Sequence, residues 1–238
     1  MTKKDRIWIF SLTVVGCLII FLYSCKKPDS KANDSVISVA DKDGNIYKTV
    51  TIDTQFWMAE NLKTTSYNDG TSIPLVIDST AWINLIAPGY CWYKNNANLY
   101  KDTYGALYNW YAVNTGKLCP VGWHVPTDAE WTILTTYLGG ENVAGGKLKE
   151  AGTIHWRSPN VGATNESFFT ALPSGFRIIF PGTDRAIGFD IGLWSSTEGN
   201  MSGAFGRYID YNSGAIGNSR INYYSKKYGF SVRCLKDN

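Results

Sequence analysis

Hydrophobic and polar residues alternate along much of the chain after residue 35, and each alternating stretch is short. Residues 36–39 and 46–52 alternate with the period of a β-strand, and Asp43-Gly44 between them supplies the positive φ of a tight turn. We therefore predict a β-hairpin here. Turn residues separate further strand-like segments, which are 90–93, 168–173, 192–197, 206–211, 219–224 and 228–234.

One helix is predicted over residues 104–113, where three apolar residues recur at the spacing that places side chains on one helical face. They are Leu107, Trp110 and Tyr111. Residues 78–88 and 95–98 contain turn-forming residues without a helical period, and we interpret both as loops or turns.

A second helix is predicted after Thr127, because Thr127 with Glu130 three residues later forms a capping box. Its apolar stripe consists of Trp131, Leu134, Thr135 and Leu138. Gly139-Gly140 ends it. Together these elements predict one α+β domain over residues 35–238, with two short helices and many short antiparallel strands.

Residues 1–24 have the organisation of an export signal. Lys3, Lys4 and Arg6 form a basic start, and the run over residues 7–23 carries no charged side chain. As a helix this run of 17 residues would extend about 26 Å, slightly less than the ~30 Å hydrocarbon core of a bilayer. A permanent transmembrane helix is therefore marginal by length alone.

The end of this run favours a cleaved signal peptide over an uncleaved signal anchor, which stays the alternative. Residues 22–25 (Leu-Tyr-Ser-Cys) resemble the bacterial lipobox, although Tyr23 is bulkier than the residue usually found there. We therefore predict a lipoprotein signal peptide over residues 1–24, with cleavage before Cys25 and attachment of the lipid to its thiol. Residues 25–34 are polar and predict a flexible tether to the membrane.

The charge of the chain gives no reason to expect a nucleic-acid partner. Residues 1–24 hold three of the 23 basic and one of the 20 acidic residues, so the remainder is nearly neutral. The aromatic content is high, with 9 Trp, 15 Tyr and 10 Phe. We expect most of these rings in the core, and the rest in an exposed platform.

Three cysteines remain once Cys17 has left with the signal and Cys25 carries lipid: Cys91, Cys119 and Cys234. Outside the cytoplasm disulfides persist, and three thiols allow one pair and one free cysteine. None of them stands in a CxxC or Cys/His spacing, so a zinc site is not expected.

The sequence contains no recognisable catalytic motif, and we expect neither an enzyme nor a cofactor. His124 and His155 each stand beside a tryptophan, and we interpret both as packed side chains rather than general bases or ligands. For Asp184, Asp190 and Asp210 we expect a solvated surface role in preference to calcium ligation. An enzyme would need polar side chains converging beside one of the histidines.

Seven segments of the chain, in this order, resemble the Fibrobacter succinogenes major paralogous domain family. They are VTIDTQFWMAENLKTTSYNDGTSIP, YGALYNWYAV, LCPVGWHVPTDAEW, GGKLKEAG, FTALPSGFR, LWSSTE and GFSVRCLKD. The resemblance covers nearly all of residues 35–238. Family members are secreted or lipid-anchored surface proteins of Bacteroidetes-type and Fibrobacter bacteria. The resemblance therefore implies a location in the cell envelope, at the outer membrane or the cell surface.

That family is similar to the C-type-lectin-like fold, which formylglycine-generating enzymes also use. In such folds a helix near the start is tied to the last strand, which implies a Cys119–Cys234 disulfide and leaves Cys91 as a buried free thiol. Pairing of Cys91 with either partner stays open. The redox cysteine pair of those enzymes and the calcium-binding Glu-Pro-Asn and Trp-Asn-Asp motifs have no counterpart here. Neither activity is therefore carried over.

Two functions from different classes follow. The first is a lipid-anchored binding or adhesion module for a glycan or a surface protein, with exposed rings as a stacking platform. The candidate rings are Trp194, Tyr208, Tyr211, Tyr223 and Tyr224. The alternative is a structural surface protein without a small-molecule ligand, whose rings lie mainly in the core.

Overall fold

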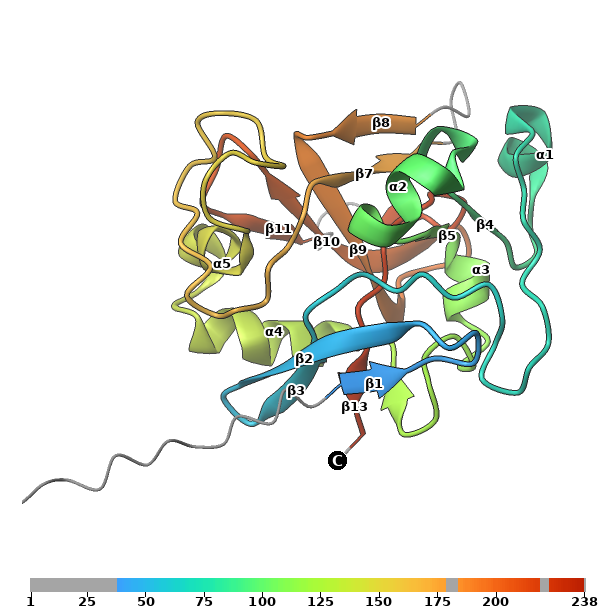
Figure 1. The fold of residues 1–238 in the computed structure, drawn as a ribbon, viewed down its shortest axis with the longest axis horizontal. Helices are drawn as coiled ribbons and strands as arrows, with labels where there is room; N and C mark the ends of the chain where they lie inside the picture. Colours follow the sequence, from blue (N-terminus) through green and yellow to red (C-terminus); the bar gives the residue numbers. More distant parts are fainter. Residues whose placement is uncertain (1–37, 179–183, 219–222, 238) are drawn as a thin grey trace, which may run out of the picture. The chain divides into compact units, whose positions relative to one another are not determined.

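The structure is a computed structural model and describes residues 38–178, 184–218 and 223–237 (Figure 1). The predicted hairpin forms its first element. β1 (Ser38–Ala40) pairs antiparallel with β2 (Ile46–Ile52). The Asp41 carboxylate closes the turn by accepting hydrogen bonds from the backbone N–H groups of Asp43 (3.0 Å) and Asn45 (2.9 Å). Residues 36 and 37 of the predicted hairpin, and 219–222 of a predicted strand, lie outside the described residues.

A five-stranded sheet joins the beginning of the domain to its end. Its order is β1-β2-β3-β13-β6, with β3 at Gln55–Met58, β6 at Trp123–His124 and β13 at Leu235–Lys236. Leu235 lies opposite Trp57 on one side and His124 on the other. The last residues of the described chain therefore lie between strands formed by earlier segments.

A second sheet holds most of the C-terminal part, in the order β11-β10-β9-β7-β8, with β12 also paired to β10. β7 runs parallel to β9, and the other pairs are antiparallel. The strands are β7 (Ser174–Arg177), β8 (Asp184–Ile187), β9 (Asp190–Glu198), β10 (Gly203–Asp210), β11 (Ile216–Asn218) and β12 (Tyr224–Ser225). A small pair is formed by β4 (Tyr90–Cys91) and β5 (Leu107–Tyr108).

The helix predicted from the capping box is α4 (Asp128–Tyr137). Thr127 Oγ1 accepts from the Glu130 N–H at 3.2 Å, and Glu130 Oε2 accepts from the Thr127 N–H at 2.7 Å, so both halves of the box are formed. The predicted stripe is buried along its whole length. Gly139 and Gly140 have φ of 98° and 95° and end the helix as predicted.

The expectation of only two helices was wrong. The described residues also contain α1 (Ser79–Asn84), α2 (Ala97–Tyr104), α3 (Trp110–Val113), α5 (Glu141–Leu148) and a 3₁₀ turn at Tyr93–Asn95. The segments interpreted as loops form α1 and α2 because Asp78 and Asn96 act as N-caps; their side chains accept hydrogen bonds from the third following N–H. Short capped helices therefore occur where no helical period is visible.

The helix predicted over residues 104–113 is restricted to α3, because two residues interrupt it. Gly105 has a φ of 75°, and a Cβ there would lie 2.7 Å from the Leu62 carbonyl oxygen, so the chain leaves α2 at this point. Asn109 then caps α3 by accepting from the Ala112 N–H at 3.0 Å. Between them Leu107 and Tyr108 form β5.

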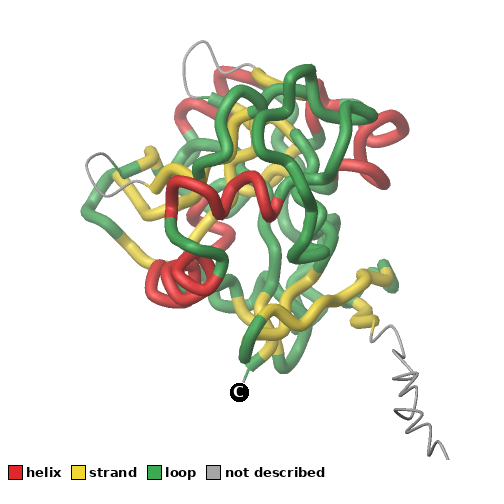
Figure 2. The backbone as a smooth tube through the Cα atoms, turned by 90° about the vertical axis from the view of Figure 1, so that its left-hand side faces the viewer, coloured by secondary structure: helices red, strands yellow, loops and turns green. Residues whose placement is uncertain are grey.

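Six tryptophans are fully buried: Trp57, Trp82, Trp110, Trp131, Trp156 and Trp194. Buried cations connect the loops around this aromatic core. The ammonium of Lys149 donates to the carbonyl oxygens of Val161, Asp210 and Ser213 at 2.8–3.0 Å. Irregular backbone makes up much of the fold (Figure 2). Buried side-chain donors such as the Lys149 ammonium supply hydrogen bonds to its carbonyl groups.

Cys119 and Cys234 form a disulfide, which confirms the pairing implied by the family resemblance. Cys119 lies in the loop between α3 and β6 rather than in a helix, and Cys234 immediately precedes β13. Cys91 is a buried free thiol. Among the described residues, no helix has the length and apolar character needed to cross a membrane.

Candidate functional site

The exposed ring platform expected around Trp194 is not present. Trp194 is fully buried, and its indole N–H donates to the Tyr108 carbonyl oxygen at 2.8 Å. All residues from Asp190 to Ser195 in β9 are buried, because this strand lies inside the sheet with both faces covered. Trp194 is therefore a core residue, and the assignment of a ligand-stacking role to it was wrong.

The four tyrosines of the expected platform pack against different neighbours. Tyr208, Tyr211 and Tyr224 are half-buried, and only Tyr223 is exposed. Each ring contacts another aromatic ring at 5.0–6.2 Å between centroids, and the pairs are Tyr208–Phe176, Tyr211–Phe189, Tyr223–Phe205 and Tyr224–Phe230. Most of their aromatic surface is therefore used in internal packing.

A pocket on another part of the domain has the character of a ligand site. Its volume is about 290 Å³. Segments from three parts of the sequence line it: Tyr67, Thr71 and Pro74; Ala87 and Pro88; Thr115 and Lys117. We call it the Tyr67 pocket. It is a mostly apolar concavity with a few polar groups, which is the usual composition of small-molecule sites.

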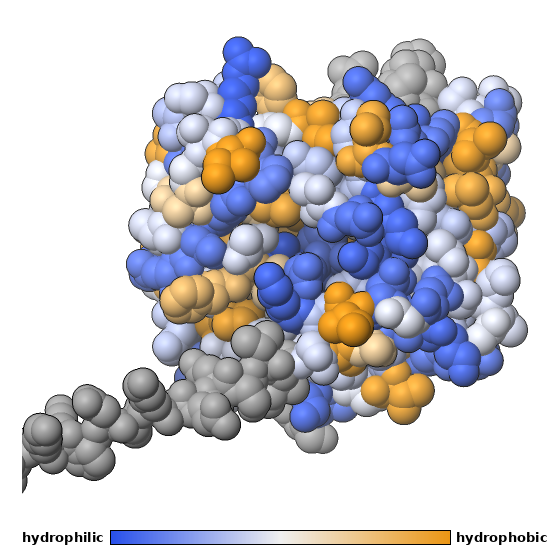
Figure 3. All heavy atoms as spheres, viewed as in Figure 1, coloured by the Kyte–Doolittle hydropathy of each residue, from blue (hydrophilic) through white to orange (hydrophobic). Residues whose placement is uncertain are grey.

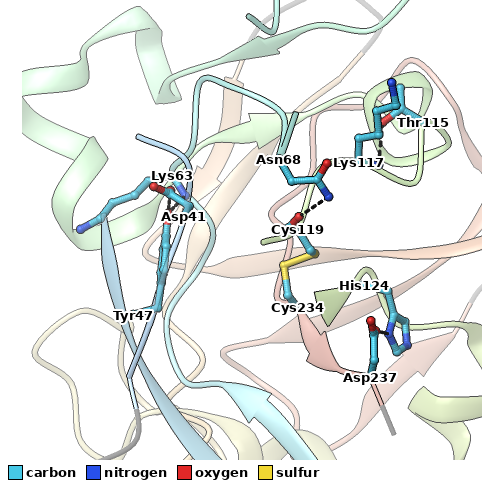
Figure 4. The surroundings of a disulfide bond; sticks show 10 residues. All are labelled: Asp41, Tyr47, Lys63, Asn68, Thr115, Lys117, Cys119, His124, Cys234 and Asp237. Carbon is cyan, nitrogen blue, oxygen red and sulfur yellow. Dashed lines mark hydrogen bonds and ion pairs between the residues drawn. A yellow bond between two sulfur atoms is a disulfide. The ribbon is translucent and has the colours of Figure 1, made fainter. Parts of the chain in front are cut away.

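Two loops that form the Tyr67 pocket are held together beside the disulfide (Figure 4). The Asn68 N–H donates to the Lys117 carbonyl oxygen at 2.9 Å, and Asn68 Nδ2 donates to the Cys119 carbonyl oxygen at 3.0 Å. Gly70, with a φ of 89°, closes a tight turn by donating to the Tyr67 carbonyl oxygen. The disulfide and these hydrogen bonds therefore fix the pocket wall before any ligand binds.

The charges at the pocket are matched within the protein. Lys117 Nζ donates to Asp69 Oδ2 at 2.8 Å, and the Thr71 hydroxyl donates to Asp69 Oδ1 at 2.6 Å. These hydrogen bonds, with that of Lys117 the largest cause, hold the pKa of Asp69 well below its usual range. Asp69 stays ionised and compensates Lys117, so the pocket has no unpaired charge to offer.

The hydroxyl of Tyr67 is buried beside Thr115. Tyr67 is 7% exposed, and its hydroxyl oxygen has almost no contact with solvent and no hydrogen bond of standard geometry among the described residues. Burial raises the pKa of this hydroxyl, and a weak hydrogen-bonding interaction with the Thr115 side chain lowers it in part. The Thr115 hydroxyl itself donates to the Ala112 carbonyl oxygen at 2.8 Å.

Exposed apolar side chains lie close in the sequence to the segments that line the pocket. Leu75, Ile77 and Ile86 are 50%, 59% and 73% exposed. Leu75 and Ile86 directly adjoin the lining residues Pro74 and Ala87 in the sequence, and Ile77 lies two positions beyond Leu75. Orange apolar side chains gather at the edge of the molecule where α1 lies (Figure 3). Single exposed apolar residues are normal, but a group beside a pocket is typical of a binding surface.

Both histidines contact carboxylates, and the ring of His155 also packs edge-on against Tyr104, with 5.9 Å between ring centroids. His124 Nδ1 lies 2.6 Å from Asp237 Oδ1 and its Nε2 lies 3.0 Å from Glu130 Oε1. Burial lowers the pKa of His124, but these carboxylates outweigh it and the net pKa is raised. His155 Nδ1 contacts both carboxylate oxygens of Glu150 at 2.9 Å. Neither histidine lines the Tyr67 pocket.

Two of the three aspartates expected at the solvated surface are buried. Asp184 forms an ion pair with Arg177 at 2.7 Å, with both side chains almost fully buried. Asp190 lies directly opposite Asp210 in the β9–β10 ladder. Burial, with a further contribution from Asp210, raises the pKa of Asp190 to about 6, although its hydrogen bond to Tyr208 acts in the opposite direction. Within the described residues, no group of three His, Cys, Asp or Glu side chains is placed to hold a metal ion.

The sequence gives little sign of the Tyr67 pocket, because its lining residues are separated by up to 50 positions and include no charged motif. The model of the Fibrobacter succinogenes major domain family matches residues 50–236. No curated protein and no solved structure shows significant similarity to the chain. The match covers most of the chain, which therefore belongs to the Fibrobacter succinogenes major domain family.

Proposed function

We propose that this protein is a lipid-anchored cell-surface binding module without catalytic activity, and that a glycan is its ligand. The observation that carries the proposal is the Tyr67 pocket, a mostly apolar concavity with a few polar groups and with exposed apolar residues beside it.

The dimensions of the pocket support a small ligand group. Its volume of about 290 Å³ lies at the lower end of the range of roughly 300–1,000 Å³ for ligand pockets. It is suited to one sugar unit or a substituent of it. The exposed apolar residues beside it, such as Leu75 and Ile86, extend the contact surface for a longer chain.

Blocking the pocket tests this proposal. Ala87 is exposed and lines the pocket, so Ala87→Trp should fill it without disturbing the core. We expect the parent protein to bind members of an immobilised panel of bacterial and host glycans, and Ala87→Trp to lose at least tenfold in affinity. Ala151→Trp, at an exposed alanine that does not line the pocket, is the matched control and should bind as the parent does. Equal binding by both variants would exclude this site.

A structural surface protein without a small-molecule ligand is the second candidate. The observation that favours it is the burial of Trp194 together with the internal packing of Tyr208, Tyr211 and Tyr224. On this view the aromatic residues serve packing alone. A blank result for the parent on the glycan panel, together with envelope defects on deletion of the protein, would favour this candidate.

The anchor is a separate part of the proposal. We infer a signal peptide over residues 1–24, lipid on Cys25, a tether over residues 25–34 and a location at the outer membrane or cell surface. The support is the charge pattern and the lipobox-like residues that end at Cys25. Cys25→Ala should abolish incorporation of labelled palmitate, whereas Cys91→Ala should retain it. Labelling of the Cys25→Ala protein would contradict lipidation at this residue.

The finer assignment of the fold is also a proposal. We propose that the α+β domain is C-type-lectin-like. The support is that the last strand, β13, pairs with the early strand β3 in one sheet, and that Cys234 just before it is tied to Cys119. An experimental structure that superimposes on lectin-like domains with the same strand order would support this assignment, and a different order would overturn it.

A further inference from the structure

We propose that His124 is a proton-dependent clamp that fastens the C-terminal strand β13 to the beginning of α4. His124 is the last residue of β6, and it lies between Glu130 in the first turn of α4 and Asp237, the residue that follows β13. Figure 4 shows the Asp237 carboxylate beside the ring of His124. The clamp stands apart from the binding function and the lipid anchor proposed above, and its test depends on neither.

Both ring nitrogens of His124 face a carboxylate. Nδ1 lies 2.6 Å from Asp237 Oδ1, and Nε2 lies 3.0 Å from Glu130 Oε1. An ionised carboxylate only accepts hydrogen bonds, and a neutral imidazole carries a single N–H. Both contacts are therefore hydrogen bonds only when the ring is protonated. Loss of the proton leaves a nitrogen lone pair against a carboxylate, whichever nitrogen keeps its hydrogen.

On the α4 side, the carboxylate is held in place by the capping box as well. Glu130 Oε2 accepts from the Thr127 N–H at 2.7 Å and from the Thr127 hydroxyl at 2.8 Å. Burial acts to raise the pKa of Glu130, but these hydrogen bonds and the contact with His124 outweigh it, so the pKa is lowered. Glu130 is therefore a fixed, ionised partner for the ring.

On the β13 side, the clamp holds the end of a short strand. β13 has 2 residues, and after it the Asp237 N–H donates to the Gly122 carbonyl oxygen at 2.9 Å. Among the described residues, the Asp237 carboxylate bonds to no side chain other than His124. Cys234, just before β13, is fixed by its disulfide. Loss of the clamp therefore loosens residues 235–237 and leaves the preceding chain in place.

In the part of the chain that the structure describes, no other cation forms an ion pair with these two carboxylates. Lys236 lies opposite Trp123 in the ladder, so it occupies the face of the sheet opposite to that of His124. The remaining polar side chains of α4 and β3 at this point have partners of their own: Asp128 pairs with Arg207, and Gln55 donates to the Glu130 carbonyl oxygen.

The direction of the pH dependence follows from the two carboxylates. Burial lowers the pKa of His124, but the hydrogen bonds to Asp237 and Glu130 outweigh it, and the pKa lies above its ordinary value of 6.5. A raised histidine pKa contributes stability that is fully present below 6.5 and is lost as the pH rises through the folded-state pKa. The clamp is therefore closed in mildly acidic solution and opens toward alkaline pH.

Hydrogen exchange of the C-terminal peptide, measured by mass spectrometry on the full chain in detergent micelles, tests the clamp. In the parent we expect protection, corrected for intrinsic exchange rates, to fall about threefold or more from pH 6 to pH 9, as suits the loss of one partly exposed hydrogen bond. Asp237→Asn introduces an amide that can donate to the neutral ring. Its protection should therefore stay nearly constant over this range.

Imidazole NMR provides a second readout that a merely structural contact would not change. The chain has 2 histidines, so His155→Gln identifies the signals of His124. We expect His124 to titrate above 6.5 in the parent and nearer to 6.5 in Asp237→Asn. His155→Gln is also the matched control for exchange, because His155 faces a carboxylate with one nitrogen only, and it should keep the fall seen in the parent.

Three outcomes would overturn the inference. One is equal protection of the C-terminal peptide at pH 6 and pH 9 in the parent. Another is an equal fall in the parent and in Asp237→Asn. The third is titration of His124 at or below 6.5 in the parent.

Discussion

Asp190 is a residue whose charge works against the fold at neutral pH. It lies opposite Asp210 in the β9–β10 ladder, and one of its carboxylate oxygens is buried without a hydrogen-bond partner among the described residues. Like charges directly opposite each other in a sheet are destabilising. Its pKa in the folded state is about 6, above the ordinary value of 3.8. The folded state therefore binds this proton more tightly than the unfolded state does.

The sign of the pH dependence follows from this difference. A raised carboxyl pKa contributes stability that is complete below about pH 4 and is lost as the pH rises through about 6. Asp190→Asn should therefore raise the unfolding temperature at pH 7.5 by about 3 °C, or roughly 1 kcal/mol after allowance for solvent screening. At pH 4 it should have little effect. Asp53→Asn, at an exposed site, is the control, and an equal gain from both variants at pH 7.5 would contradict this account.

Trp194 shows why the burial of a single side chain could not be predicted from the sequence. Its neighbours Gly192, Leu193 and Ser195 gave no period-two alternation, and a strand covered on both faces has none. An exposed ring and a buried ring have the same local sequence in that situation. Tyr67 was equally hidden, because its importance depends on Pro88 and Thr115, which reach it only through the fold.

At the scale of elements, α4 was predictable because all its signals are local. Thr127 and Glu130 are three residues apart, and both hydrogen bonds of the capping box form. Thr127→Ala removes the side-chain acceptor for the Glu130 N–H. We expect it to lower the free energy of unfolding by about 1 kcal/mol, measured by urea titration.

Thr103→Ala is the matched control for this prediction. Thr103 is an exposed residue within α2 and is not a cap, and alanine has the higher helix propensity, so stability should be unchanged or slightly higher. An equal loss in both variants would show that the capping box contributes nothing measurable.

The other short helices were missed for a related physical reason. Asp78 and Asn96 are good N-caps, but the helices that they begin bury few side chains, with only Trp82 buried in α1 and no residue buried in α2. Without a buried face there is no apolar period to recognise. The opposite error, a helix over residues 104–113, arose because Leu107 and Trp110 are buried by tertiary pairing and not by one helical face.

At the scale of the whole molecule, the Cys119–Cys234 disulfide closes a loop with a sequence separation of 115 residues. In the chain-entropy model a loop of this length stabilises the fold by about 4–5 kcal/mol, as an upper value. The Cys119→Ser, Cys234→Ser double variant should therefore unfold roughly 10 °C below the parent in a calorimetric scan.

Reduction of the parent should reproduce this effect, and reduction of the double variant should have none. Cys91→Ala is the control, since Cys91 forms no disulfide, and its unfolding temperature should still fall on reduction. If reduction left the parent unchanged, the disulfide would not be a source of stability.

The position of β13 also determines when the domain can form. Leu235 pairs with β3 on one side and with β6 on the other, and Cys234 beside it joins the earlier loop. A chain that emerges N-terminus first from a ribosome or a translocation channel cannot complete this sheet until residues 235 and 236 have emerged. Until then β3 and β6 lack the strand that lies between them. The five-stranded sheet can therefore form only after nearly all of the described residues have been released.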